Sequence, residues 1–261
     1  MSTHNKIECF ATPDGRAFLA REESTTHKQL PPGVYKYDLE MNGMWYHQQE
    51  IPSGIVIPDR AQQEVMAEIG QFWSPEAMAL YAKLGFPHKR GVLLYGPPGT
   101  GKTTLIKMVV QDVIKRGGIA LELCHAGEFQ SALTLFRDAC PDTPVVVTIE
   151  DLDRYMHGHE ELILGILDGS YAINHVLFIA STNKKDDLSE RLTRPSRFDC
   201  PKMIDLPDEA ARRRYIEGLL PGSDKAAVEA LVKESKNESI AHLKERVLQR
   251  LIYSNKTRQK T

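Results

Sequence analysis

Short apolar runs alternate with amphipathic stretches through the middle of this chain. The apolar runs are rich in β-branched and large aliphatic residues, which is typical of strands buried on both faces of a parallel sheet. We expect such strands at 91–95, 118–124, 145–149, 175–180 and 202–204. Helical periodicity lies between them, at 105–114, 129–139, 160–167 and 187–192. This alternation predicts an α/β fold in which helices flank a parallel sheet.

Residues 1–50 show a different pattern, in which short β-favouring runs are separated by turn signals. Strands are expected at 6–11, 16–21, 33–39 and 44–49. The dipeptide Asn42-Gly43 lies between the last two and favours a tight hairpin, and Thr12–Gly15 separates the first two. Two hairpins make a small sheet that is stable only when it packs on something. We expect its core to be aromatic, with a partner-binding face as the alternative; the side chains are Tyr35, Tyr37, Trp45 and Tyr46.

Helical patterns without strands lie on both sides of the α/β region. Before it, a linker at 51–58 leads to two helices capped by Asp59 and Ser74. The last helical patterns lie at 208–219, 223–233 and 239–253, and we expect the basic tail, 254–261, to fray. The chain is therefore predicted to contain a small β domain or adaptor, an α/β domain and an all-helical subdomain, at 1–52, 53–206 and 207–261.

Charge, cysteine spacing and hydropathy argue against a nucleic-acid-binding protein, a cysteine-ligated metal site or a membrane-spanning protein. Lys and Arg number 33 against 35 Asp and Glu, so no overall charge calls for a nucleic acid or an anionic membrane. The cysteines have no metal-like spacing and suit a reducing cytoplasm; they are Cys9, Cys124, Cys140 and Cys200. No apolar run approaches the 18 residues of a membrane span, and the N-terminus lacks a signal pattern. We expect a cytoplasmic location.

A glycine-rich turn joins the first predicted α/β strand to the helix that follows. The turn matches G-x-x-x-x-G-K-[ST], and the strand before it and the helix after it give the match its meaning. Its successive N–H groups are expected to hold a phosphate, aided by the positive end of the helix. Lys102 is expected to reach the β- and γ-phosphates, and Thr103 to ligate Mg²⁺. The candidate nucleotide-binding residues are Gly96, Pro97, Pro98, Gly99, Thr100, Gly101, Lys102, Thr103 and Thr104.

A second constellation follows the apolar run at 145–149. Glu150 and Asp151 come directly after it. In P-loop NTPases a second buried strand lies beside the phosphate-binding strand and carries acids at its carboxyl end, and this run is expected to be that strand. One carboxylate holds Mg²⁺ and its neighbour activates the attacking water. The order Glu then Asp reverses the usual one. We assign the metal to Glu150 and the water to Asp151, and leave open that the two roles are exchanged.

Five motifs in order resemble an AAA+ ATPase of the AAA clade. They are Gly96–Thr103, the acidic strand end, Leu167-Asp-Gly169, Ile179–Asn183 and Leu192–Asp199. The Glu-Asp order, Leu167-Asp-Gly169 and Arg-Pro-x-Arg look closest to the mitochondrial Rieske-protein translocase group, with proteasomal and FtsH-type ATPases more distant. The resemblance covers about 55–255 and implies an AAA+ core with a small helical lid.

The resemblance also implies roles for polar residues outside the phosphate loop. Asn183 matches the sensor that contacts the attacking water or the γ-phosphate. Arg194 and Arg197 match a pair of arginine fingers that serve the nucleotide of a neighbouring subunit, with Arg191 as a weaker candidate. Catalysis in trans implies a homo-oligomeric ring, a hexamer in this family, with ATP and Mg²⁺ as ligands. Ser239–His242 falls near where the lid approaches the nucleotide.

Two segments depart from the pattern of protein-threading motors. His125-Ala126-Gly127 stands where an aromatic gripping loop is usual, so either the ring does not thread chains or it grips them differently. The segment 153–159 is the next candidate for a loop facing a pore. Three functions remain open: a ring that remodels or translocates a protein client, a nucleic-acid-acting protein such as a helicase or loader, and a scaffold or switch that hydrolyses ATP slowly.

Overall fold

The computed structural model describes residues 8–11, 17–21, 29–40, 43–51, 59–168 and 174–258. Several predicted features lie wholly or partly outside these residues. They are the turn at 12–15, Asn42 of the hairpin turn, most of the linker 51–58, Gly169 and the end of the basic tail.

The described strands form one sheet, in the order β1-β2-β4-β3-β6-β7-β8-β5-β9. The first four strands are antiparallel to one another, and β3, β6, β7, β8, β5 and β9 are all parallel. Their bounds are β1 (Glu8–Ala11), β2 (Ala17–Arg21), β3 (Gly33–Glu40), β4 (Gly43–Gln49), β5 (Lys89–Tyr95), β6 (Ile119–Glu122), β7 (Val145–Ile149), β8 (Val176–Thr182) and β9 (Cys200–Met203).

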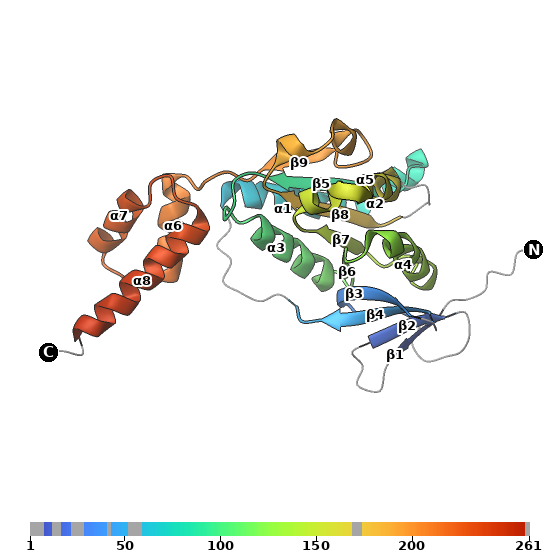
Figure 1. Cartoon of the computed structure of the whole chain (residues 1–261), viewed down its shortest axis with the longest axis horizontal. Coiled ribbons are helices and arrows are strands. Elements are labelled where there is room, and N and C mark those ends of the chain that lie inside the picture. Colours follow the sequence, from blue (N-terminus) through green and yellow to red (C-terminus); the bar gives the residue numbers. More distant parts are fainter. Residues whose placement is uncertain are drawn as a thin grey trace, which may run out of the picture.

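Helices cover both faces of the parallel strands, as the alternating pattern predicts (Figure 1). On β7, Val146 packs with α1 (Arg60–Phe72) and α3 (Lys102–Lys115), and the flanking Val145 and Val147 pack with α4 (Ala126–Ala139) and α5 (Leu152–Asp168). Both faces are buried, which explains why these strands are continuously apolar. Short α2 (Pro75–Leu84) follows α1, and two 3₁₀ turns lie at Lys185–Asp187 and Glu190–Thr193.

The C-terminal helices form a separate cluster beside the sheet. Helices α6 (Glu209–Leu219), α7 (Lys225–Glu234) and α8 (Ile240–Arg258) pack around their own apolar core, which includes Ile216 and Leu231. Figure 1 shows them to one side of the sheet, with α8 extending away from it. The tail, which we expected to fray from residue 254, is helical through Arg258 because α8 runs on without a breaker. No helix in the described ranges is long and apolar enough to cross a membrane.

The N-terminal strands extend the main sheet instead of forming a sheet of their own. Strand β3 pairs in parallel with β6, and Gly33 lies opposite Ile119. Tyr35, Tyr37 and Tyr46 are buried, and the Tyr46 hydroxyl donates to the carbonyl of Ala132 in α4. The division at residue 52 stays a prediction, but the hydrogen-bonded sheet continues across it.

Two local expectations are wrong. The acidic strand β7 does not lie beside β5, because β8 is inserted between them. The segment 153–159 is not a loop, because α5 begins at Leu152 and runs through it. The buried Leu152 and the partly buried Tyr155 and Met156 pack against the core, and this contact outweighs the helix-breaking tendency of Gly158.

A buried histidine joins the start of β5 to α1 and β8. The His88 ring stacks on Phe72 at a centroid distance of 4.0 Å, and its Nε2 lies 2.9 Å from the Phe72 carbonyl oxygen. Since a carbonyl only accepts, Nε2 carries the hydrogen and the Nδ1 of neutral His88 accepts from Nδ1 of His175, 3.3 Å away. Burial lowers the pKa of both histidines, so the folded protein favours their neutral forms.

We expect this pair to destabilise the fold in mild acid. The unfolded chain takes up protons below its ordinary histidine pKa of about 6.5, whereas the folded chain resists them, so the free energy of unfolding falls as the pH drops through that value. Urea unfolding between pH 8 and 5.5 measures this slope. His88→Gln keeps a donor for the Phe72 carbonyl and should flatten the slope; an unchanged slope would contradict the assignment.

Candidate nucleotide-binding site

The glycine-rich turn connects the carboxyl end of β5 to the first turn of α3. Gly96 has a φ of +141°, and a Cβ there would lie 2.2 Å from the carbonyl oxygen of Ile204. Gly99 has a φ of +75°. These conformations and the close packing exclude side chains, so the loop's amides stay free to approach a ligand. The side chain of Thr100 donates to the Pro97 carbonyl and braces the turn from within.

Lys102 lies folded back on the loop. Its Nζ donates to the carbonyls of Gly96 and Pro97, both at 2.8 Å. The side chain is buried, and burial lowers the pKa of its ammonium against the opposing effect of the Asp151 carboxylate. Phosphate oxygens would satisfy this buried cation better than neutral carbonyls, because they carry the opposite charge and attract the ammonium more strongly.

The two predicted acids face different groups. Glu150 accepts a 2.7 Å hydrogen bond from the Thr103 hydroxyl, so the pair assigned to Mg²⁺ is already in contact. Asp151 has a φ of +51°, a conformation that Asp tolerates better than most residues. Its side chain forms an exposed ion pair with Arg154 at 3.2 Å. Asp151, unlike Glu150, lines the cavity over the phosphate loop.

A third acid, Asp153, holds the turn that carries Asn183. Its carboxylate accepts from the Thr182 hydroxyl at 2.9 Å, and that hydroxyl accepts from the amide of Lys184 at 3.0 Å. Asn183 lies between the two residues and borders the same cavity as Asp151. The ends of β7 and β8 are therefore tied together at the place where the sequence predicts the reacting water.

The cavity over the loop is about 380 Å³. Eight of the predicted catalytic and nucleotide-binding residues border it, together with the unpredicted Ser181. The eight are Pro98, Gly99, Gly101, Lys102, Thr103, Thr104, Asp151 and Asn183. Gly96, Pro97 and Thr100 form the loop behind it. From the helical subdomain, Ile240 and Ala241 of the predicted segment Ser239–His242 close the cavity, together with two residues that sequence reasoning missed, Tyr215 and Lys244.

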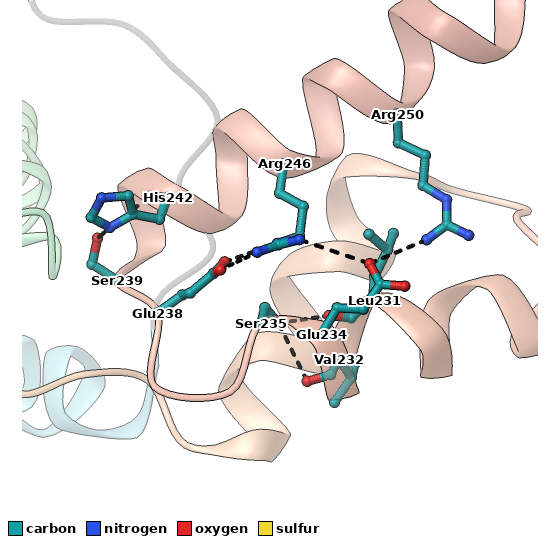
Figure 2. Close-up of polar contacts among 9 residues, drawn as sticks. All are labelled: Leu231, Val232, Glu234, Ser235, Glu238, Ser239, His242, Arg246 and Arg250. Atoms are coloured by element: carbon teal, nitrogen blue, oxygen red, sulfur yellow. Dashed lines mark hydrogen bonds and ion pairs between the residues drawn. The ribbon is translucent and has the colours of Figure 1, made fainter.

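The helical subdomain contacts the loop directly. The amide of Ala241 donates to the Gly99 carbonyl at 3.1 Å, and a Cβ on Gly99 would lie 2.7 Å from the Ser239 hydroxyl oxygen. Figure 2 shows how this end of α8 is braced. Ser239 Oγ lies 2.9 Å from Nδ1 of His242, and Arg246 pairs with Glu238 just before the helix and with Glu234 in α7. The predicted segment Ser239–His242 thus lies against the phosphate loop.

The predicted arginine pair lies away from the cavity. Arg197 binds Asp168 through two hydrogen bonds of 2.5 and 2.6 Å, and Arg191 pairs with Glu161. Arg194 is exposed, and its guanidinium forms no ion pair with a described residue. The Arg197 carbonyl packs against Gly91, near the start of β5. Gly96, at the other end, is roughly 16 Å further along the strand direction at 3.3 Å per residue.

A family comparison agrees with this geometry. Residues 92–206 match the model of the ATPase family associated with various cellular activities (AAA). The match begins within β5 and spans the loop, the acids, Asn183 and both arginines. This stretch of the chain matches an AAA ATPase domain.

Three relatives share this domain. The chain is 34% identical over 154 residues to the cell division cycle protein 48 homolog of Archaeoglobus fulgidus, covering 53% of this chain and 21% of that protein. It is 31% identical over 181 residues to the ATP-dependent zinc metalloprotease YME1L of Drosophila melanogaster, covering 60% and 23%. It is 34% identical over 173 residues to the ATP-dependent zinc metalloprotease FtsH 3 of Symbiobacterium thermophilum, covering 58% and 27%. The chain thus matches about a quarter or less of each relative's length.

The AAA domain predicts that Lys102 is essential for nucleotide binding. We expect Lys102→Ala to weaken ATP binding by about 100-fold or more, because it removes the buried cation of the phosphate loop. Binding of a fluorescent ATP analogue measures the effect. Lys115→Ala, at the far end of the same helix, is the matched control and should bind normally; equal affinity of the two variants would contradict the assignment.

Proposed function

We propose that this chain is an ATP-hydrolysing subunit of a homo-oligomeric ring that remodels or translocates a protein client. A hexamer is the ring size that the family resemblance implies. The observation that carries the proposal is the separation of the predicted arginine fingers from the cavity. Arg194 and Arg197 lie near the start of β5 and the phosphate loop follows its end, so one copy does not supply both to the same nucleotide.

In this proposal the residues at and beside the cavity divide into phosphate-binding, water-activating and metal-binding groups. The loop amides and Lys102 hold the β- and γ-phosphates, and Asn183 orients the attacking water. Asp151 accepts the proton of that water, which makes it the general base. Thr103 and Glu150 would hold Mg²⁺, which would supply positive charge to offset that of the phosphates. The 2.7 Å contact between Thr103 and Glu150 supports this pairing of ligands.

A protein client is favoured over a nucleic acid by charge. With a net charge of −2, the chain as a whole has no electrostatic attraction for a phosphate backbone. The reversed acid order at 150–151 and the two-arginine motif also support placing the chain near the mitochondrial Rieske-protein translocase group. A cytoplasmic location remains part of the proposal.

The two acidic roles are tested by isosteric amides. Asp151→Asn keeps the tolerance for positive φ and should bind ATP normally while turnover falls by roughly 10²- to 10⁴-fold. Glu150→Gln should instead raise the Mg²⁺ concentration needed for turnover. Phosphate release measured across a Mg²⁺ titration separates the two. If Glu150→Gln traps ATP at saturating Mg²⁺ while Asp151→Asn turns over, the roles are exchanged.

The proposal that Arg194 acts on the nucleotide of a neighbouring subunit is tested by mixing two inactive variants. Arg194→Ala should bind ATP but lose about 10³-fold or more in turnover, because the neighbour's charge on the transition state is missing. Its own Asp151 is intact, and an Asp151→Asn subunit still carries Arg194. Mixed rings should therefore regain activity, roughly a quarter of wild type for random assembly at equal amounts in a closed ring.

Arg60→Ala, a solvent-exposed arginine in α1, is the control and should keep full activity. An Arg194→Ala variant with normal turnover, or a mixture that stays inactive although mixed rings are seen by mass spectrometry, would overturn the trans assignment.

A further inference from the structure

We propose that Lys244 of α8 is a second cation for the nucleotide's polyphosphate chain, supplied from the helical subdomain. This inference rests on the proposed function, because it assigns a further binding residue to the same cavity. Lys244 borders that cavity together with Gly99, Lys102 and Thr103, which belong to the phosphate loop.

The geometry of α8 directs Lys244 toward the loop. Ala241, whose amide donates to the Gly99 carbonyl, lies three residues earlier, and Ile240, another cavity residue, lies four residues earlier. Residues at these spacings share one face of a helix. The face of α8 that docks on the phosphate loop is therefore the face that carries Lys244.

Lys244 is also available to bind an anion. It is exposed and forms no ion pair with any residue that the structure describes, although several other cations of this subdomain do. Arg246, two residues later on another face, pairs with Glu238 and Glu234 (Figure 2). The only other lysine that borders the described cavity is Lys102. A triphosphate in this cavity would thus meet one cation from the start of α3 and one from α8.

The alternative is that Lys244 is an ordinary solvated surface lysine. A solvated lysine makes no difference to nucleotide affinity, whereas a phosphate ligand does. The two readings also differ in salt dependence, because a contact between a lysine and a phosphate at the mouth of a cavity is screened by ions.

Three substitutions separate these readings, with binding of ATP and ADP analogues measured at low salt. Lys244→Gln keeps the length of the side chain and removes its charge, and we expect about tenfold weaker binding of both nucleotides. Lys244→Arg should restore binding to within about twofold, because a guanidinium also binds phosphate. Lys233→Ala, an exposed lysine on α7, should leave affinity unchanged.

Two controls make the result decisive. The melting temperature without nucleotide should be the same for all three variants, because Lys244 has no structural partner. The affinity of Lys244→Gln should depend less on salt than that of the wild type. Wild-type affinity in Lys244→Gln would overturn the inference while leaving the proposed function intact; a wild-type chain that binds no ATP would instead overturn the proposed function.

Discussion

The parallel register of β5, β8 and β7 is the constraint on which the rest of the site depends. Tyr95 at the end of β5 lies opposite Thr182 of β8, and Ile149 at the end of β7 lies opposite Ala180. The three strands therefore end at the same edge of the sheet. The phosphate loop, Asp151 and Asn183 follow these ends directly, and all three border one cavity.

The same register helps to explain why Asp151 and Glu150 contact different groups. Asp151 and Ser181 meet because β7 and β8 are neighbours, and the amide of Asp151 lies 3.4 Å from the Ser181 hydroxyl. Glu150, one residue earlier in the turn after β7, instead accepts a hydrogen bond from Thr103. The end of β7 thus carries one acid that contacts the phosphate-loop Thr103 and another that borders the cavity, as the proposed metal and water roles require. The left-handed backbone at Asp151 fits Asp better than Glu and gives a physical reason for the reversed order.

Most of the α/β core could be predicted because burial on both faces leaves a clear apolar run in each strand. Strand β7 has the predicted bounds, 145–149. The pairing of β3 with β6 could not be predicted, because the pattern of a strand does not say which edge it joins. The first turns of α5 were missed because polar residues and Gly158 hide the helical period. The phosphate loop has a strong sequence signal. Lys244 has none, because its role depends on how α8 docks on Gly99.

The two arginines are not equivalent, and this difference bears on how a ring would close. Arg197 already binds Asp168 through two hydrogen bonds, and its side chain is only 12% exposed. To contact a neighbour's phosphate it must exchange that carboxylate for the new anion. Arg194 forms no ion pair with a described residue and meets no such competition. In the proposed ring, a heterologous contact in which one copy's β5 start faces the next copy's β5 end would present Arg194 to the phosphates without breaking an ion pair with a described residue. Arg197, by contrast, would have to give up Asp168, so its engagement would be a separate step that ring assembly has to drive.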